Sequence, residues 1–338
     1  MKISVVIPCR NEKPYIKECV DAIFVCELPQ DTQMSVFVVD GMSDDGTREV
    51  ISELQKKYPL LVLVDNKKQL TPFAFNLGIY AGGKVDFVQI IGARHIVSTN
   101  YIKRSVEILQ NDSSIWCVGG QLINEYTNTN SEIISKAMNT TFGMGIGNFR
   151  ILKKSGFTDT VTSPMYPYWV FDKIGFFDEQ LVRNQDDDFN FRVTKNGGKI
   201  YFEHDISLRY YVRASFKGLY KQFFQYGYWK VFVNKKHNAL TTTRQMIPPI
   251  FVLFLILFPF TFIINEYLAL ISSLFLLIYL LMGFYFAIKN GKGINEKLGI
   301  FKTFPILHLG YGLGYLKGII HFILLRKGPS NRETQLTR

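Results

Sequence analysis

The longest apolar stretch of the chain constrains its fold most. Residues 247–288 are almost continuously apolar, and the main interruption is the pair Asn265-Glu266. A bilayer core needs about 20 apolar residues per helix, and a stretch of roughly that length lies on each side of the pair. Neither stretch has the polar face expected of a hairpin in a soluble protein. We therefore predict two transmembrane helices over residues 246–289, joined by a tight turn.

Charge predicts how this hairpin is oriented. Basic residues flank it on both sides and its turn is acidic, so the positive-inside rule places both ends in the cytosol. Residues 206–338 hold 17 Lys and Arg against 3 Asp and Glu, and this basic half is also the most apolar part of the chain. That combination indicates anionic membrane lipids as partners, and no nucleic acid. We expect a multi-pass protein of the cell (inner or plasma) membrane with residues 1–205 in the cytosol.

Two further segments border the hairpin. Residues 206–245 form a basic aromatic segment that we expect to lie in the lipid headgroup layer, with an ordinary solvated helix face as the alternative. Its basic residues recur every four positions, at Arg209, Arg213, Lys217 and Lys221. Residues 290–338 divide into a cytosolic loop, a glycine-containing apolar stretch at 304–325 and a basic tail. We interpret that stretch as interfacial or re-entrant, with a third span as the alternative.

The first 110 residues alternate between two kinds of pattern. Strand-like apolar runs lie at residues 3–8, 35–40, 60–65 and 86–91, and helix-like patterns lie around residues 12–26, 47–57, 71–81 and 100–110. Strands buried on both faces with helical crossovers predict an α/β fold over residues 1–205, with a Rossmann-like, doubly wound, mostly parallel sheet. Ligands of such sheets bind in the loops at the carboxyl ends of the strands.

Two of these loops carry consistent chemistry. PCRNE follows the first strand, and VVDGMSDDGT contains the end of the second. Asp40 ends that strand, where its carboxylate can accept from a nucleobase or a ribose hydroxyl. Gly46 and Thr47 begin the next helix, whose free N–H groups suit a phosphate. A polar turn with a helix cap is the alternative, which two such loops on adjacent strands disfavour.

These loops and several later motifs resemble family 2 glycosyltransferases, which have the GT-A fold. The resemblance covers about residues 2–250 and rests on VVIPCRNE, VVDGMSDDGT, TPFAFNLGI, TFGMGIGNFR and IGFFDEQLVRNQDDDFNFRVTKNGGKI. QFFQYGYWK and the C-terminal spans are similar to the succinoglycan-type, membrane-associated glucosyltransferase subgroup. The resemblance implies a nucleotide-sugar donor, with a UDP-sugar as the first candidate. The residues it implies are Pro8, Asn11 and Glu12 lining the donor site, Asp40 on uracil or ribose, and Gln225 and Trp229 on the acceptor or the diphosphate.

The resemblance also places the general base at Asp186, with Asp187 beside it. An inverting transfer needs one carboxylate to take the proton of the acceptor hydroxyl as it attacks the anomeric carbon, and such a base contributes about 10²–10⁴-fold. The alternative is an acidic helix start without chemistry, paired with Arg192. The chain departs from the family at Gln185, which is more often Glu, and at Tyr228, which is Arg in the last motif. The first departure leaves Asp186 in place, and the second weakens the implied role of that motif.

The largest departure is at the expected metal site. The family usually holds Mg²⁺ or Mn²⁺ on the donor diphosphate with carboxylates at the end of the fourth strand, where this chain reads Gly92-Ala93-Arg94. Three interpretations remain open. Arg94 clamps the diphosphate, His95 holds a metal with a carboxylate such as Asp187, or the site has lost activity. We favour the first two, and Arg94 over His95, because a lone histidine is more often structural and imidazole suits Zn²⁺ better than Mg²⁺.

Together these features predict an inverting glycosyltransferase at the cytosolic face of the membrane. It would move a hexose from a nucleotide-diphosphate sugar to a lipid-linked or polysaccharide precursor. The rival from another class is a catalytically degenerate GT-A membrane protein that binds a nucleotide sugar or a partner enzyme. A processive polysaccharide synthase is a lesser rival, because two or three spans are too few to line a conduit.

Overall fold

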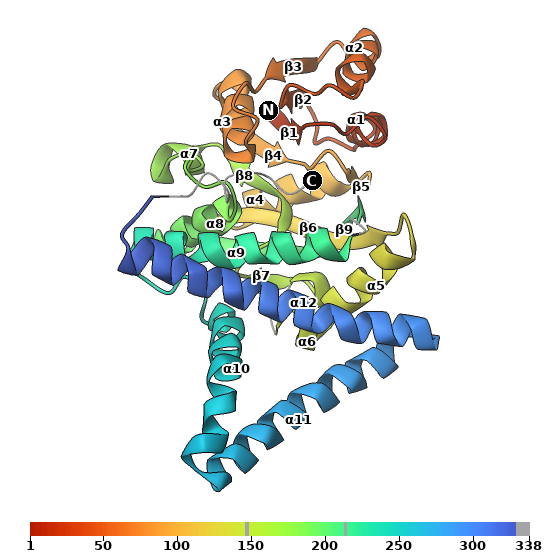
Figure 1. Ribbon diagram of the computed structural model, residues 1–338. Helices are drawn as coiled ribbons and strands as arrows, with labels where there is room; N and C mark the ends of the chain where they lie inside the picture. Colours follow the sequence, from red (N-terminus) through yellow and green to blue (C-terminus); the bar gives the residue numbers. More distant parts are fainter. Residues whose placement is uncertain (146–148, 213–214, 329–338) are drawn as a thin grey trace. The chain divides into compact units, whose positions relative to one another are not determined.

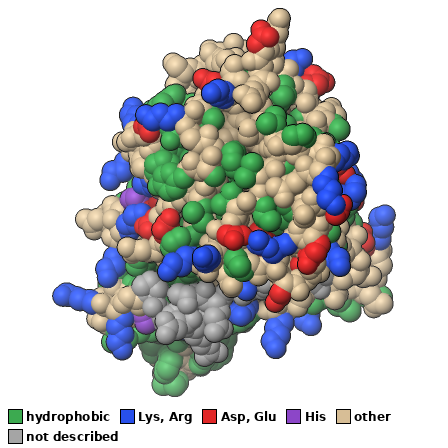
Figure 2. Space-filling view, turned by 90° about the horizontal axis from the view of Figure 1, so that it is seen from above, with side chains coloured by type: hydrophobic (Ala, Val, Ile, Leu, Met, Phe, Trp, Pro, Cys, Tyr) green, Lys and Arg blue, Asp and Glu red, His purple; other side chains and the backbone are tan. Residues whose placement is uncertain are grey.

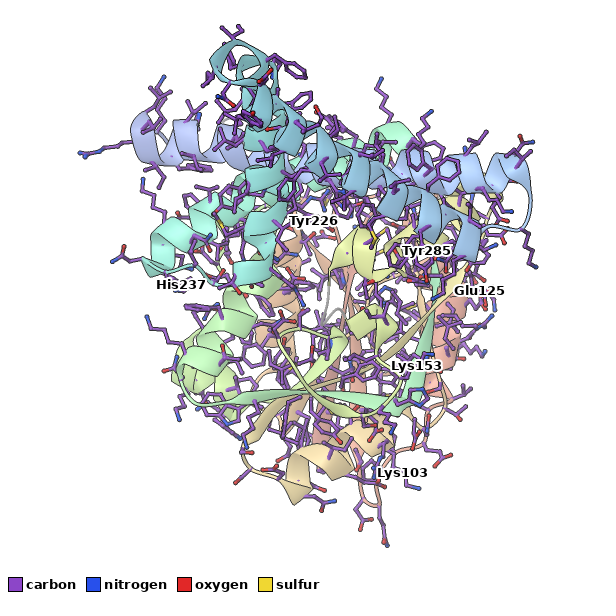
Figure 3. All side chains as sticks on the ribbon, turned by 90° about the horizontal axis from the view of Figure 1, so that it is seen from below. Lys103, Glu125, Lys153, Tyr226, His237 and Tyr285 are labelled. Carbon is purple, nitrogen blue, oxygen red and sulfur yellow. The ribbon has the colours of Figure 1, made fainter. Side chains whose placement is uncertain are left out.

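The computed structural model describes residues 1–145, 149–212 and 215–328, and the chain forms two compact units. The first unit comprises Met1–Glu125 and Leu152–Tyr211, and the second comprises Tyr126–Ile151 and Val212–Arg338. The predicted domain boundary at residue 205 therefore falls inside a strand of the first unit. The segment Tyr126–Ile151 leaves the first unit and returns to it, a division that local sequence patterns did not indicate. Glu125, where the chain first leaves the first unit, is labelled in Figure 3.

The first unit is built on one nine-stranded sheet with the order β3-β2-β1-β4-β8-β6-β9-β5, and β7 pairs with β9. Its first four strands are parallel, as predicted, with β1 between β2 and β4 and with β3 at the edge (Figure 1). The bounds are β1 Lys2–Cys9, β2 Gln33–Asp40, β3 Leu61–Asp65 and β4 Phe87–Ile90. The crossover helices are α1 Ile16–Phe24, α2 Thr47–Lys57, α3 Thr71–Gly82 and α4 Tyr101–Asn111. All eight elements were predicted from the alternation of apolar runs.

Both faces of β1 are covered, which is what makes the sheet doubly wound. Ile3, Val5 and Ile7 belong to a core cluster with residues of α1, α2 and α4. On the other face Gly78 of α3 lies so close to Val6 that a Cβ there would be 2.4 Å from a Val6 methyl group. The motif TPFAFNLGI therefore brings α3 tightly against the sheet.

The second half of the sheet is mixed rather than mostly parallel. β6 and β9 are parallel, but β8 is antiparallel to both β4 and β6, and β5 and β7 are antiparallel to β9. The bounds are β5 His95–Val97, β6 Ile115–Glu125, β7 Gly156–Thr158, β8 Thr162–Pro167 and β9 Lys199–Tyr211. Two short helices, α7 Trp169–Ile174 and α8 Gln185–Lys195, complete the first unit. Acidic and basic side chains are interspersed on the face shown in Figure 2.

The second unit is helical. It contains α5 Thr129–Met138, α6 Thr141–Met144, the short 3₁₀ helices η1 Phe149–Ile151 and η2 Thr243–Met246, α9 Phe216–His237, α10 Ile247–Ile264, α11 Glu266–Asn290, α12 Ile294–Gly318 and the π-helix η3 Ile319–Leu324. Figure 3 marks α9 by Tyr226 and His237, and α11 by Tyr285. Ile133 and Ala137 of α5 pack with residues of α11 and α12, so the segment that leaves the sheet is part of this unit's core.

Helices α9 and α12 meet along a glycine seam, which we define as Gly227 on α9 and Gly310, Gly314 and Gly318 on α12. A Cβ at Gly227 would lie 2.0 Å from the Tyr311 carbonyl oxygen, and one at Gly314 would lie 2.0 Å from the Phe224 carbonyl oxygen. Small residues four apart on one face let two helix backbones touch. The seam therefore accounts for the glycines that the sequence placed within the apolar stretch 304–325.

The two predicted spans are confirmed as helices long and apolar enough to cross a membrane, over Thr243–Ile264 and Glu266–Asn290. Asn265 forms the turn, and its side-chain oxygen accepts from the backbone N–H groups of Tyr267 and Leu268 at 2.8 and 3.3 Å. The stretch 304–325 instead lies within α12 and η3, and α12 begins at Ile294, inside the predicted cytosolic loop. That helix is long enough to span a bilayer, but among the described residues only the two helices above are also apolar enough to do so.

The basic aromatic segment is divided between two elements. Its later part is helical, as predicted, and Lys217 and Lys221 lie on α9. Arg209 lies on β9, where its guanidinium is paired with the Glu18 carboxylate at 3.0 Å. Arg213 is outside the described residues. The four-residue spacing therefore does not continue along a single helix.

Candidate functional site

The candidate site begins where the carboxyl ends of the first three strands align. Cys9 of β1 is paired in register with Asp40 of β2, and Asp40 is paired with Asp65 of β3. The loops that follow these strands therefore leave the sheet side by side. Burial raises the pKa of the Cys9 thiol well above its ordinary value, and the Asp40 carboxylate adds to the effect. Cys9 is therefore a protonated core residue and not a nucleophile.

Asp40 anchors the loop after β2. Its carboxylate is fully buried and accepts from the Ser43 backbone N–H at 2.8 Å, from the Ser43 hydroxyl and from Arg48 Nη1 at 2.8 Å. Arg48 Nη2 also donates to Asp65 Oδ1 at 2.8 Å, and the Asp65 side chain is 47% exposed. Arg48 and Asp65 were not predicted as site residues, because their pairing depends on the register of β2 and β3. Of the two aspartates, Asp65 is the one that presents a carboxylate to solvent.

The loops after β1 and β2 are joined by reciprocal hydrogen bonds. The Asn11 side chain donates to Asp44 Oδ1 at 2.8 Å and accepts from the Asp44 backbone N–H at 3.1 Å. The Glu12 backbone N–H donates to the Thr47 hydroxyl at 2.9 Å. Gly46 precedes α2 with φ +92°, a backbone conformation that suits glycine. The structure thus brings Asn11 and Glu12 together with the start of α2, while Pro8 lies in β1 opposite Val39.

The position of Gly92-Ala93-Arg94 follows β4 and faces the loop after β1. Arg94 Nε donates to Glu12 Oε2 at 2.6 Å, and the guanidinium lies over the Tyr15 ring, 4.6 Å from its centroid. Both ionic side chains are largely buried, with 24% and 13% of their surfaces exposed. The sequence predicted Arg94 at this place, but Tyr15 and the pairing with Glu12 were not predicted.

His95 turns back onto the loop that carries it. Its Nδ1 accepts from the Gly92 backbone N–H at 3.3 Å and lies 2.7 Å from the Ser163 hydroxyl. Because a backbone amide only donates, this nitrogen carries a lone pair and the neutral ring has its hydrogen on Nε2. Among the described residues no group of three His, Cys, Asp or Glu side chains is arranged to hold a metal ion. The side chains after β4 therefore do not provide the pair of carboxylates that would suit a divalent ion.

The acidic cluster begins α8, as predicted. Asn184 precedes the helix with φ +60°, and Asp186, Asp187 and Asp188 occupy its first turn. Asp186 is exposed, whereas Asp188 is fully buried and paired with Arg192 Nε at 3.0 Å. Arg192 also donates to the backbone carbonyl oxygens of residues 174–176. Arg192 is therefore committed to Asp188, and the exposed carboxylate of the cluster is Asp186.

A buried asparagine on α3 holds the loop that leads to α8. Asn76 donates to the Phe177 carbonyl oxygen and to Glu179 Oε1, both at 2.9 Å, and accepts from the Phe177 N–H at 3.0 Å. Its side chain is only 3% exposed. Sequence reasoning missed Asn76 as a positioning residue. Its occurrence in the motif TPFAFNLGI was the only signal, and the partner lies 101 positions away.

Gln225 and Trp229 belong to the second unit. Both lie on α9 and are fully buried, and the Trp229 ring packs against Phe232 and Phe322. Lys230, next to Trp229 on α9, is also fully buried, and its Nζ lies 3.3 Å from the Thr242 hydroxyl. The role of Gln225 and Trp229 at the acceptor or diphosphate remains a prediction.

Comparison with known proteins identifies the family. The profile described as "Glycosyltransferase like family 2" matches residues 1–227. This chain belongs to glycosyltransferase family 2. The family 2 assignment confirms the resemblance read from the loop motifs, and it makes the protein an enzyme that transfers a sugar.

Two curated relatives of this family 2 enzyme extend the match into the second unit. One is the dolichyl N-acetyl-alpha-D-glucosaminyl phosphate 3-beta-D-2,3-diacetamido-2,3-dideoxy-beta-D-glucuronosyltransferase of Methanococcus voltae, 30% identical over 331 residues, with 94% of this chain and 97% of the relative covered. The other is the succinoglycan biosynthesis protein ExoA of Rhizobium meliloti (strain 1021), 28% identical over 246 residues, with 72% and 73% covered. The predicted similarity to the succinoglycan-type subgroup is thereby confirmed.

A solved structure shares the fold. The mannosyltransferase PcManGT from Pyrobaculum calidifontis, in complex with GDP-Man and Mn²⁺, superposes with a TM-score of 0.57 at 15% identity, covering 94% of this chain and 86% of that one. The GT-A fold predicted for the first unit is confirmed by this likeness. A divalent ion is thus compatible with the fold, although the side chains after β4 differ from a metal-binding set.

Proposed function

We propose that this family 2 glycosyltransferase moves a hexose, with inversion, from a nucleotide-diphosphate sugar to a lipid-linked saccharide at the cytosolic face of the cell membrane. The observation that carries the proposal is the exposed Asp186 carboxylate on the first turn of α8, in a unit whose strand-end loops we assign to the donor. The names of the relatives support an acceptor on a lipid or a polysaccharide precursor, since one acts on a dolichyl phosphate glycan and the other in succinoglycan biosynthesis.

On the donor side, we assign the nucleotide to the loops after β1, β2 and β3. Pro8, Asn11 and Glu12 would line it, and Asp40 would act mainly by fixing the loop that meets the base or ribose. Asp65 is the more exposed carboxylate at the same edge and can accept an N–H or O–H of the nucleoside. Arg94 would face the diphosphate. A UDP-sugar is the first donor to test, and a GDP-sugar is the second because PcManGT was solved with GDP-Man.

The reaction assigned to Asp186 is a single displacement. Its carboxylate takes the proton of the acceptor hydroxyl, the hydroxyl oxygen bonds to the anomeric carbon, and the bond from that carbon to the diphosphate oxygen breaks. The nucleoside diphosphate leaves with the electron pair. Asp187 is half-buried beside it, and its negative charge would favour transfer of the proton to Asp186. Asp188 and Arg192 hold the start of the helix in place.

The membrane assignment rests on α10 and α11. Many of their large apolar side chains are exposed, including Ile263, Ile264 and Leu270 at 83%, 70% and 69%. Such surface is stable in lipid and not in water, so we propose that both helices span the bilayer. The basic flanks place both ends in the cytosol with anionic lipids around them. Multi-pass topology and a cytosolic catalytic unit follow from this proposal.

The test separates turnover from binding in the purified full chain. Asp186→Asn should lower sugar transfer to lipid acceptor extracted from the source membranes by about 10²–10⁴-fold, because it removes the base. Its affinity for the nucleotide, measured by calorimetry, should stay within about twofold, since the donor loops are unchanged. Glu53→Gln, an exposed acidic side chain on α2, is the matched control and should keep full activity. Undiminished transfer by Asp186→Asn would reject the assignment of the base.

A further inference from the structure

We infer that the donor diphosphate is neutralised by arginine side chains in place of a divalent metal ion, with Arg94 and Arg10 as the two guanidinium groups. The inference rests on the proposed donor site and adds the chemistry by which that site would hold the leaving group. It concerns only the first unit, where the loops after β1, β2 and β4 are described together.

Arg94 is held in a conformation that leaves one edge of its guanidinium for a ligand. Glu12 accepts from Nε, and Tyr15 lies under the planar face. Within the described part of the chain, the two Nη nitrogens have no hydrogen-bond partner. When Nε is already bonded, the two Nη nitrogens still carry four N–H groups. Phosphate oxygens can accept hydrogen bonds from these groups, including in pairs. Glu12 and Tyr15 therefore preorganise Arg94 for an anion.

Arg10 supplies an independent observation in the loop after β1. Its Nε is shielded from solvent and has no hydrogen-bond partner among the described residues. Its side chain lies along Gly41, where a Cβ would be 2.9 Å from Arg10 Cδ, so only glycine leaves room for it. A buried guanidinium N–H without an acceptor costs free energy, and an anion in the site would supply that acceptor. Arg10 thus points to the same kind of ligand as Arg94.

A third cation lies in the loop after β1. The Lys13 ammonium lies over Gly46 at the start of α2, where a Cβ would be 2.8 Å from Nζ. Asp44 and Asp45 lie in the same loops as Glu12, so the three cations stand beside three carboxylates. The case for an anion therefore comes from the geometry of Arg94 and Arg10, and Lys13 adds a further cation near the start of α2.

The residues after β4 would serve a metal ion poorly. Mg²⁺ and Mn²⁺ prefer oxygen ligands, and neither Gly92 nor Ala93 has a side-chain oxygen. Glu12, the carboxylate that contacts this position, is paired with Arg94 at 2.6 Å. His95 presents Nδ1 to the Gly92 N–H, and a metal on Nε2 would require the opposite tautomer and the loss of that hydrogen bond. The side chains at this position therefore suit the binding of an anion by arginines better than the binding of a metal ion.

The experiment measures nucleotide affinity in the detergent-purified full chain by calorimetry, with UDP and GDP as probes, in excess EDTA and in Mn²⁺. The nucleotide that binds should do so in EDTA with an affinity within about threefold of that in Mn²⁺. Arg94→Gln and Arg10→Gln should each weaken binding in EDTA by about tenfold or more, because each removes charge-assisted hydrogen bonds. Arg94→Lys should recover part of the loss, since it restores charge without the planar fork.

The controls separate this inference from the donor site on which it rests. Lys103→Gln removes an exposed cation on α4 and should leave the affinity unchanged. Thermal melts show which variants remain folded, and Arg10→Gln replaces Arg94→Gln as the informative variant if the latter is unstable. Binding that disappears in EDTA and returns with Mn²⁺, with Arg94→Gln and Arg10→Gln like the wild type, overturns the arginine clamp and keeps the donor site. Absence of binding under both conditions overturns the donor site and the clamp together.

Discussion

The contacts inside the first unit differ in kind from those inside the second. In the first unit the strand-end loops are joined by buried polar contacts, such as Asp40 with Arg48 and Asn11 with Asp44. In the second unit, α9 and α12 approach through glycines that carry no side chain at all. Catalytic loops need polar groups fixed at definite positions, and the polar contacts supply that. Close backbone packing between small residues, with buried rings such as Trp229 beside it, holds these two helices together.

This contrast predicts different responses to substitution. A polar contact in the first unit can be lost with a moderate effect, because water or a neighbouring group replaces part of it. A side chain placed in the glycine seam would clash with backbone atoms of the facing helix, which cannot move aside as a flexible side chain can.

The seam should be the most sensitive position. Gly227→Leu would place a Cβ 2.0 Å from the Tyr311 carbonyl oxygen and should separate α9 from α12. We expect a loss of folded protein, equivalent to more than about 4 kcal/mol, because neither backbone can move alone. Size-exclusion chromatography in detergent measures it. Gly218→Ala on the same helix is the matched control, since its nearest neighbour would be the Ser215 Cβ at 3.5 Å. Normal folding of Gly227→Leu would show that the seam is not tightly packed.

The buried ion pair of the first unit should come next. Arg48→Met removes the cation opposite the fully buried Asp40 and should lower the free energy of unfolding by about 2–4 kcal/mol. A melt of the purified protein measures the change. Lys56→Gln breaks an exposed pair with Glu53 on the same helix and should cost less than about 0.5 kcal/mol. Equal effects of the two substitutions would mean that Asp40 does not anchor its loop.

A surface carboxylate should give the smallest effect, and one that depends on pH. Burial raises the pKa of Asp21, but hydrogen bonds from Lys17, Tyr58 and Lys57 outweigh it and lower the pKa from 3.8 to about 2. A lowered folded-state pKa stabilises the protein above the ordinary value, and this contribution is lost as the pH falls from about 4 towards 2. Asp21→Asn should therefore cost about 1 kcal/mol at pH 7, after allowance for its partial exposure. The difference in melting temperature from wild type should narrow below pH 4, and a gap that stays constant would contradict the shift.

Much of the first unit could be predicted from local patterns. Strands and helices up to residue 111 follow from alternating apolar runs. Arg94 was singled out because it follows a strand end, and Asp186 because the family resemblance places the general base there. Arg48, Asp65 and Asn76 could not be found in this way, because each is defined by a partner that only the sheet register or a distant loop supplies. The course of β9 through residue 205 also depends on its pairing with β6 rather than on its own sequence.

In the second unit, composition predicted the two apolar helices and their turn, since a run of apolar residues needs no partner to be recognised. The interfacial or re-entrant interpretation of residues 304–325 stays a prediction. Composition did not indicate what the glycines there do, because Gly310, Gly314 and Gly318 form the surface that receives α9. The joining of residues 126–151 to this unit rests on packing between Ile133 and α12, a contact between residues far apart in sequence.

The most direct test of this account uses sealed membrane vesicles and a radiolabelled nucleotide sugar, which does not cross the bilayer. Inside-out vesicles expose the cytosolic face and should transfer label into the lipid extract at once, whereas right-side-out vesicles should do so only after permeabilisation. Vesicles bearing Asp186→Asn should show little label in either orientation. Transfer confined to intact right-side-out vesicles would contradict the proposed topology. Transfer that Asp186→Asn leaves unchanged would contradict the proposed chemistry.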